Sequence, residues 1–183
     1  FGSDRKFGNN KFFGLAVRYA DNKSNIHNSA QGTELESLTL NLYGIAPINE
    51  NRYINAVLGL SALRFDSKYL GNLSGSRNGK QVFTSINYRT KNTFSGLNLT
   101  PTGKFTYGVT RLSEFTDFFS KAIDGSTKDV RYAEDTFKSG EFAAGFLFNI
   151  DKIKIEQGTF QPMGGIEILY DLTPNINYKY NYQ

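Results

Sequence analysis

His27 is the only histidine in the chain, and it lies in a polar segment that also contains Asp21. A histidine beside a carboxylate can act as a general base, and a barrel protease or phospholipase needs such a pair at its rim. No nucleophile motif accompanies His27, and a histidine in a polar loop is usually just solvated. A barrel enzyme therefore remains an alternative. An activity that is lost in the variant His27→Ala would favour it.

A glycine-rich segment at 71–81, GNLSGSRNGKQ, has the composition of a phosphate-binding loop. The P-loop pattern requires a glycine where Ser74 stands and a hydroxyl residue where Gln81 stands. The segment is therefore interpreted as a surface loop.

The remaining composition excludes further classes of chemistry. There is no cysteine, which removes disulfides, thiol catalysis and zinc–thiolate sites. No second histidine and no carboxylate cluster suggests a metal site, so neither metal nor cofactor is expected. The net charge of +4 comes from 21 basic and 17 acidic residues spread along the chain, so no nucleic-acid patch is predicted.

Alternation of apolar and polar residues is the dominant pattern, and SLTLNLY at 37–43 shows it most clearly. Successive side chains of a strand point to opposite faces, so this run has a leucine face and a polar face. In a soluble sandwich the leucines would enter a core, whereas in an outer-membrane barrel they would face lipid. The same period recurs at 12–19, 54–62, 82–88, 104–110, 142–150 and 165–170.

The face opposite the apolar residues of these segments indicates which side of the sheet lies inside the barrel. It is rich in Gly, Ala, Ser and Thr with a few charges, which suits a barrel interior better than the solvent face of a soluble sheet. The residues predicted to line the lumen are Arg18, Ser37, Thr39, Asn41, Lys104, Arg111, Glu114, Glu141 and Glu167. Those predicted to face lipid are Leu38, Leu40, Leu42, Phe142, Phe146, Phe148, Ile166 and Ile168. The tyrosines predicted to form interfacial girdles are Tyr19, Tyr88, Tyr107 and Tyr170.

Connections are expected to alternate in length, as in outer-membrane barrels with long exterior loops and short periplasmic turns. The long ones are 21–34, 66–80 and 116–129, and the shorter ones are 46–51, 89–96 and 151–152. This gives roughly eight strands. We place them at about 11–20, 35–45, 52–66, 80–89, 97–115, 129–150, 158–171 and 175–183.

Five segments together resemble the translocator β-domain of bacterial autotransporters, the type V secretion family. They are GLAVRYADNKS (14–24), LTLNLYG (38–44), INAVLGLSALRF (54–65), LTPTGKFTYGVTRLSEF (99–115) and FQPMGGIEILYDL (160–172). Segment 14–24 resembles the family's first strand with the polar loop that follows it, and segment 38–44 resembles its L-x-L-Y-G strand. Segments 99–115 and 160–172 each place a proline before an alternating strand, as the family does. The resemblance covers nearly the whole chain through the order and spacing of these motifs. Gly165 and Ile166 replace the usual Arg-Leu pair of the second proline strand.

The resemblance implies a bacterial outer-membrane protein that anchors and exports its own passenger without covalent chemistry. Its implied partners are outer-membrane lipid, the barrel assembly machinery, and a passenger with its linker helix outside this chain, with no nucleic acid. Family barrels close with a larger, even number of strands. The chain lacks both a signal peptide and the family's aromatic-terminated last strand, so we interpret it as an excerpt of the barrel.

The predicted fold is therefore a single all-β domain over 1–183, an antiparallel up-and-down transmembrane β-barrel with its long loops extracellular. A small outer-membrane barrel of another role, such as a porin-like protein, an adhesin or an enzyme, is one alternative. A soluble all-β binding module is the other. Heat-modifiable mobility in detergent gels separates the membrane barrel from the soluble module.

Overall fold

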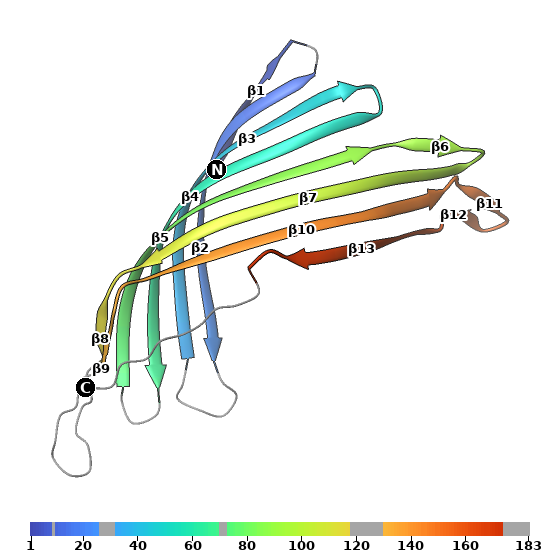
Figure 1. Cartoon of the computed structure of the whole chain (residues 1–183). Helices are drawn as coiled ribbons and strands as arrows, with labels where there is room; N and C mark the ends of the chain where they lie inside the picture. Colours follow the sequence, from blue (N-terminus) through green and yellow to red (C-terminus); the bar gives the residue numbers. More distant parts are fainter. Residues whose placement is uncertain (9, 26–31, 70–72, 118–129, 174–183) are drawn as a thin grey trace.

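The computed structural model describes residues 1–8, 10–25, 32–69, 73–117 and 130–173. Every regular element in these residues is a β-strand (Figure 1). No helix in the described part of the chain is long and apolar enough to cross a membrane.

Eight strands form a single antiparallel sheet and lie side by side in the order of the sequence. They are β1 (Gly2–Phe7), β2 (Lys11–Asn25), β3 (Gly32–Asn49), β4 (Arg52–Tyr69), β5 (Leu73–Thr90), β7 (Leu97–Leu112), β10 (Asp135–Ile150) and β13 (Met163–Asp171). The short strand β6 (Asn92–Phe94) pairs with β7. Two small hairpins lie outside the sheet: β8 (Phe115–Asp117) with β9 (Val130–Tyr132), and β11 (Ile153–Ile155) with β12 (Gly158–Phe160).

The sheet is strongly curved, like part of the wall of a barrel, and it is open (Figure 1). Within the described residues the strands at its two edges are β1 and β13. Each long strand runs antiparallel to its neighbours, so every hairpin ends at one of two rims. The β2–β3, β4–β5 and β7–β10 connections share one rim, which we call the lower rim from its place in Figure 1. The β1–β2, β3–β4, β5–β7 and β10–β13 connections share the upper rim.

The up-and-down antiparallel arrangement confirms the predicted fold class, but several strand limits differ. The strand β1 was not predicted, the strand expected at 129–150 is split at residues 133–134 between β9 and β10, and the strand expected at 97–115 ends at Leu112. The predicted strand at 175–183 lies outside the described residues.

Two of the predicted long loops are largely strand, which corrects the expected alternation in loop length. β2 continues to Asn25, β3 begins at Gly32, and β4 and β5 are separated only by residues 70–72. The glycine-rich segment at 71–81, interpreted as a surface loop, is mostly the first half of β5. Polar residues keep the backbone ladder here because cross-strand pairs hold it, as where Lys23 Nζ lies 2.6 Å from Glu34 Oε1.

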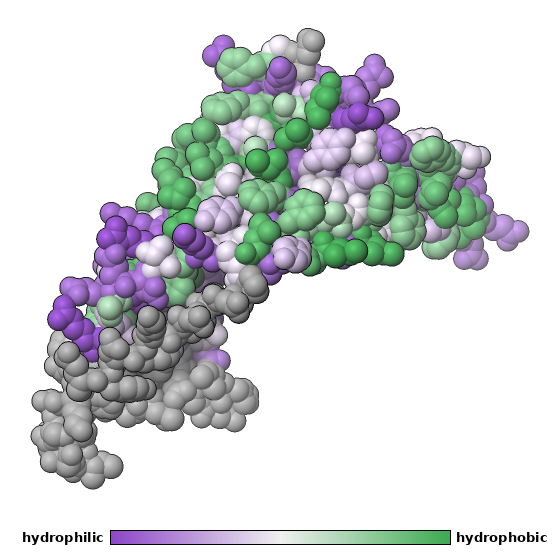
Figure 2. Space-filling model, in the orientation of Figure 1, coloured by the Kyte–Doolittle hydropathy of each residue, from purple (hydrophilic) through white to green (hydrophobic). Residues whose placement is uncertain are grey.

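The register aligns the apolar residues of all the long strands on one face, which we call the apolar face. Leu40, for example, lies opposite Val17 of β2 and Leu60 of β4. These side chains are exposed, with Leu60 at 51% and Ile168 at 74%. Figure 2 shows hydrophobic residues spread over the middle of the sheet, with hydrophilic residues towards the strand ends.

The opposite face, the polar face, is the more closely packed one. Thr39 and Ser61 are only 8% exposed, and Ala143 is the one buried hydrophobic residue in the described part of the chain. A soluble domain buries its large apolar side chains, so this distribution is the reverse of a soluble fold.

An aromatic ring packed over glycine helps to tighten the polar face. The ring of Phe83 on β5 lies directly over Gly59, its register partner on β4, in the space that a Cβ of residue 59 would need. On its other side Phe83 is opposite Gly108 of β7. The ring covers backbone that glycine leaves bare, an arrangement that stabilises strand glycines.

We expect Gly59→Val to destabilise the folded domain by about 1–3 kcal/mol, because the new side chain overlaps the Phe83 ring. The measurement is the urea midpoint of the folded, heat-modifiable band of the full-length protein. Gly103→Val is the matched control, since nothing lies within 4 Å of a Cβ at Gly103. Equal midpoints for the two variants would show that the Gly59–Phe83 contact is not a packing constraint.

Candidate functional site

The polar face carries a continuous row of hydrogen-bonding side chains across five strands. In register the row consists of Arg18, Thr39, Ser61, Gln81 and Thr110. Thr39 Oγ1 and Ser61 Oγ share a buried hydrogen bond of 2.9 Å. Gln81 Nε2 donates to Thr110 Oγ1, also at 2.9 Å. Groups that satisfy one another in this way present a polar surface without an unmet demand for one particular ligand.

An ion pair lies on the same face, six residues along β7 from Thr110. Lys104 Nζ on β7 is 3.1 Å from Glu141 Oε1 on β10, with side chains 43% and 38% exposed. In the same region Ser85 and Thr106 approach each other with their hydroxyl oxygens 3.4 Å apart. Half-exposed pairs of this kind stabilise a fold by little in open solvent. Their main effect is to leave two charges on the polar face neutralised by each other.

Seven of the nine residues predicted for the lumen share the polar face, as the strand register shows. They are Arg18, Ser37, Thr39, Asn41, Lys104, Glu141 and Glu167. All eight residues predicted to face lipid lie together on the apolar face: Leu38, Leu40, Leu42, Phe142, Phe146, Phe148, Ile166 and Ile168.

Arg111 and Glu114 do not belong with that polar group. Arg111 lies an even number of residues from Phe105 in the unbroken strand β7, so it shares the apolar face, at the lower rim. Glu114 follows the end of β7 and has no place on either face. Its carboxylate instead accepts a hydrogen bond of 2.8 Å from Arg131 of β9.

Three of the four girdle tyrosines lie towards the lower rim on the apolar face, namely Tyr19, Tyr107 and Tyr170. Tyr88 lies towards the upper rim, opposite Ile54. The hydroxyl of Tyr19 donates to Glu36 Oε1 at 3.4 Å, as suits an aromatic side chain between an apolar band and a polar end.

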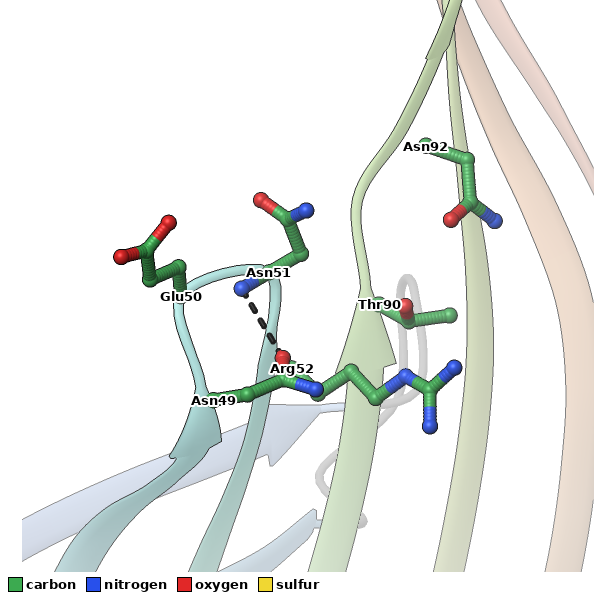
Figure 3. Close-up of a pocket in the computed structure, with 6 residues that line it drawn as sticks. All are labelled: Asn49, Glu50, Asn51, Arg52, Thr90 and Asn92. Carbon is green, nitrogen blue, oxygen red and sulfur yellow. Dashed lines mark hydrogen bonds between the residues drawn. The ribbon is translucent and has the colours of Figure 1, made fainter.

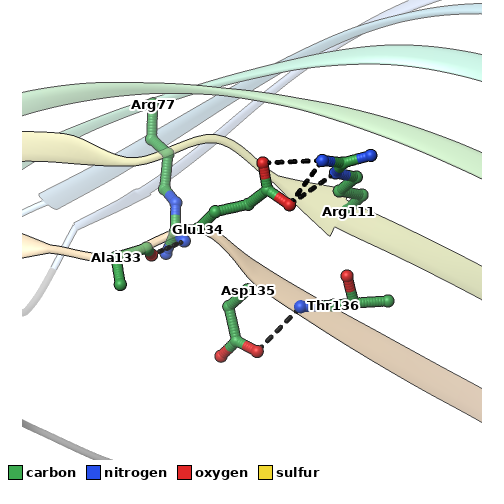
Figure 4. A network of polar contacts seen from close by, with 6 residues as sticks. All are labelled: Arg77, Arg111, Ala133, Glu134, Asp135 and Thr136. Atoms are coloured by element: carbon green, nitrogen blue, oxygen red, sulfur yellow. Dashed lines mark hydrogen bonds and ion pairs between the residues drawn. The ribbon is translucent and has the colours of Figure 1, made fainter.

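Arg77 of β5 is a structural residue that the sequence did not single out. Its Nε donates to the Ser113 carbonyl at 2.6 Å. Its Nη2 donates to the Ala133 carbonyl at 2.9 Å (Figure 4). Its guanidinium carbon also lies 5.3 Å from the ring centre of Phe115. One side chain thereby fastens both ends of the β8–β9 hairpin to β5. The signal was the two-residue period, which puts Arg77 in phase with Gln81 on the polar face.

A shallow cleft lies at the upper rim. It has a volume of about 300 Å³ and is lined by Asn49, Glu50, Asn51, Arg52, Thr90 and Asn92 (Figure 3). The backbone N–H of Asn51 donates to Asn49 Oδ1 at 3.0 Å, so part of the polar lining serves the β3–β4 turn itself.

The other candidate chemistry of the sequence concerned His27 and a metal site. His27 lies outside the described residues. Within the described ranges no group of three or more His, Cys, Asp or Glu residues could hold a metal ion.

A curved, up-and-down antiparallel sheet with an exposed apolar face and a packed polar face is the wall of an outer-membrane β-barrel. The family model of the autotransporter beta-domain matches residues 1–182, and the chain belongs to this family. Its members are outer-membrane translocators through which a passenger is exported, and this is the function of the domain. No curated protein and no solved structure matches the chain.

We expect Arg77→Gln to loosen the β8–β9 hairpin, because each lost charged hydrogen bond contributes about 1–3 kcal/mol. Even one such bond corresponds to roughly a tenfold rise in the open population. The measurement is the rate of trypsin cleavage after Arg131, which lies in β9. Arg89→Gln removes an exposed arginine from the other end of the same strand and serves as control. An unchanged cleavage rate in Arg77→Gln would contradict the anchoring role.

Proposed function

We propose that the polar face lines the lumen of the translocator and that the apolar face contacts lipid. The observation that supports this most directly is the inverted burial: leucines and isoleucines are exposed while Thr39, Ser61 and Ala143 are buried. The apolar stripe of β4, at 54–62, also has about the 9–11 residues with which a tilted strand crosses a bilayer. No charged residue interrupts that stripe.

The chemistry of the polar face suits a polypeptide that passes without being held. Hydroxyl and amide groups such as those of Thr39, Ser61 and Gln81 already bond to neighbours, so they offer weak, replaceable contacts. Lys104 and Glu141 neutralise each other and leave no strong site for a charged segment of the passenger. A linker helix in the lumen would meet the same mixed surface, with Arg18 and Glu167 as further charged contacts.

The lower rim is proposed to face the exterior. It carries the longest connection of the sheet, residues 113–134, with the β8–β9 hairpin fastened by Arg77. Polar ends of β2 to β5 extend past the apolar stripe on this side, as the Lys23–Glu34 pair shows. The assembly machinery is the proposed insertion partner, since β1 and β13, the edge strands of the described sheet, are strands with which another chain can pair.

The test reverses the charge of Lys104 in the full-length protein expressed in bacteria. Lys104→Glu places a second carboxylate beside Glu141, and we expect the amount of passenger at the cell surface to fall severalfold. The exchange Lys104→Glu with Glu141→Lys restores the pair and is expected to restore display. The measurement is protease-accessible passenger on intact cells, with heat-modifiable mobility to follow folding of the barrel.

Lys152→Glu, in the connection before β11, is the control for charge reversal away from the polar face. A display level that stays normal in Lys104→Glu, with the barrel folded, would contradict a lumen lined by this pair. A failure of the exchanged pair to restore display in a folded barrel would contradict it as well.

A further inference from the structure

Three cations lie side by side on the apolar face at the lower rim. They are Lys80 of β5, Arg111 of β7 and Lys138 of β10, which we call the basic cluster. Lys80 is directly opposite Arg111, and Lys138 is opposite Val109, two residues along β7 from Arg111. All three side chains are exposed. Their place is the level at which the apolar stripe ends.

The cluster has more positive charge than its neighbours neutralise. Arg111 binds Glu134 through two hydrogen bonds, Nε to Oε1 at 2.7 Å and Nη2 to Oε2 at 2.8 Å (Figure 4). That bond lowers the pKa of the Glu134 carboxyl, which therefore stays ionised. Among the described residues neither Lys80 nor Lys138 forms an ion pair. Like charges opposite each other destabilise a sheet, so an external anion would relieve the repulsion of Lys80 and Arg111.

The β2–β4 part of the same rim is organised differently. There Lys23 lies 2.6 Å from Glu34, and Arg64 lies 3.1 Å from Asp66. Lys23 and Arg64 are thus paired within the protein. Lys68 of β4 forms no ion pair among the described residues, but with Glu36 beside Tyr19 the carboxylates of this part still outnumber its cations. The excess of positive charge is confined to β5, β7 and β10.

The surroundings of the basic cluster fit a lipid and not a free ion. Val82 and Val109 lie opposite each other one strand period into the apolar face, beside Tyr107. Thr136, opposite Arg111, adds a hydroxyl at the level of the charges. A phosphate held by the cations would leave the acyl chains of its lipid along these apolar side chains. Ammonium and guanidinium groups at such a boundary are the usual partners of lipid phosphates.

We propose that Lys80, Arg111 and Lys138 bind the phosphate groups of lipid A, the phosphorylated glycolipid of the outer leaflet. This rests on the proposed function, because it requires the apolar face in lipid and the lower rim towards the exterior. The site adds a specific lipid partner to the wall of the translocator, on the side away from the lumen.

The experiment compares lipids on the folded full-length protein purified in detergent. Diphosphorylated lipid A, dephosphorylated lipid A and phosphatidylglycerol are added separately, and native mass spectrometry gives the lipid-bound fraction. We expect diphosphorylated lipid A to bind at least about tenfold more tightly than the dephosphorylated form, since the phosphates supply the ionic contacts. Equal affinities would overturn the proposal. Tighter binding of phosphatidylglycerol would overturn the choice of the outer-leaflet lipid.

The variant Lys80→Gln/Lys138→Gln tests the residues themselves. We expect it to lose most of the preference for diphosphorylated lipid A. Lys23→Gln/Arg64→Gln is the matched control, because it removes two cations from the same face and rim that are already paired within the protein. Full retention of the preference in Lys80→Gln/Lys138→Gln, or its equal loss in both double variants, would overturn the assignment.

Passenger display distinguishes a failure of this site from a failure of the proposed function. Lys80→Gln/Lys138→Gln is expected to fold and to display its passenger, since neither lysine is on the polar face. If the phosphate preference is absent while Lys104→Glu still blocks display, only the lipid site is wrong. Absence of both effects would count against the orientation of the two faces.

Discussion

Unbroken backbone pairing from β1 to β13 is the constraint on which the structure depends. A strand alternates its side chains with a period of two, so a slip of one residue would turn its leucines to the other face. The one irregularity in the ladder between β3 and β4 lies between Pro47 and Asn49, at the turn and beyond the apolar stripe. Through the apolar stripe the register is unbroken. It therefore keeps Leu40 aligned with the apolar residues of β2 and β4, and Asn41 aligned with the polar face.

The two faces differ in the way that the proposed translocator requires. The apolar face carries exposed leucine, isoleucine and phenylalanine, the kinds of side chain that a membrane barrel presents to lipid. The polar face packs rings over glycines and joins hydroxyls and amides, as Phe83 with Gly59 and Thr39 with Ser61 show. Charges follow the same division: Lys104 and Glu141 are paired on the polar face, while Lys80, Arg111 and Lys138 mark the edge of the apolar face.

The sequence was enough for the fold class and for the two faces, because a period of two in runs such as 37–43 survives any error in strand limits. Polar composition predicts loops at residues 21–25 and 73–80, but both are strand, held by cross-strand pairing that no local pattern displays. Arg111 is predicted to line the lumen, whereas counting in twos from Phe105 along β7 puts it on the apolar face. Arg77 was missed because its partners, Ser113 and Ala133, are distant in sequence and bind through their backbone.

The orientation of the two faces is tested most directly by spin labels on single cysteines in the full-length protein, reconstituted in bilayers. This domain has no cysteine, so Leu40→Cys and Asn41→Cys each introduce one defined label position in it. The measurement is relaxation of the label by oxygen, which concentrates in lipid, and by a water-soluble nickel chelate. The label at 40 should respond more to oxygen and the label at 41 more to nickel. The opposite preference at the two positions would contradict a lipid-facing leucine surface and a polar lumen.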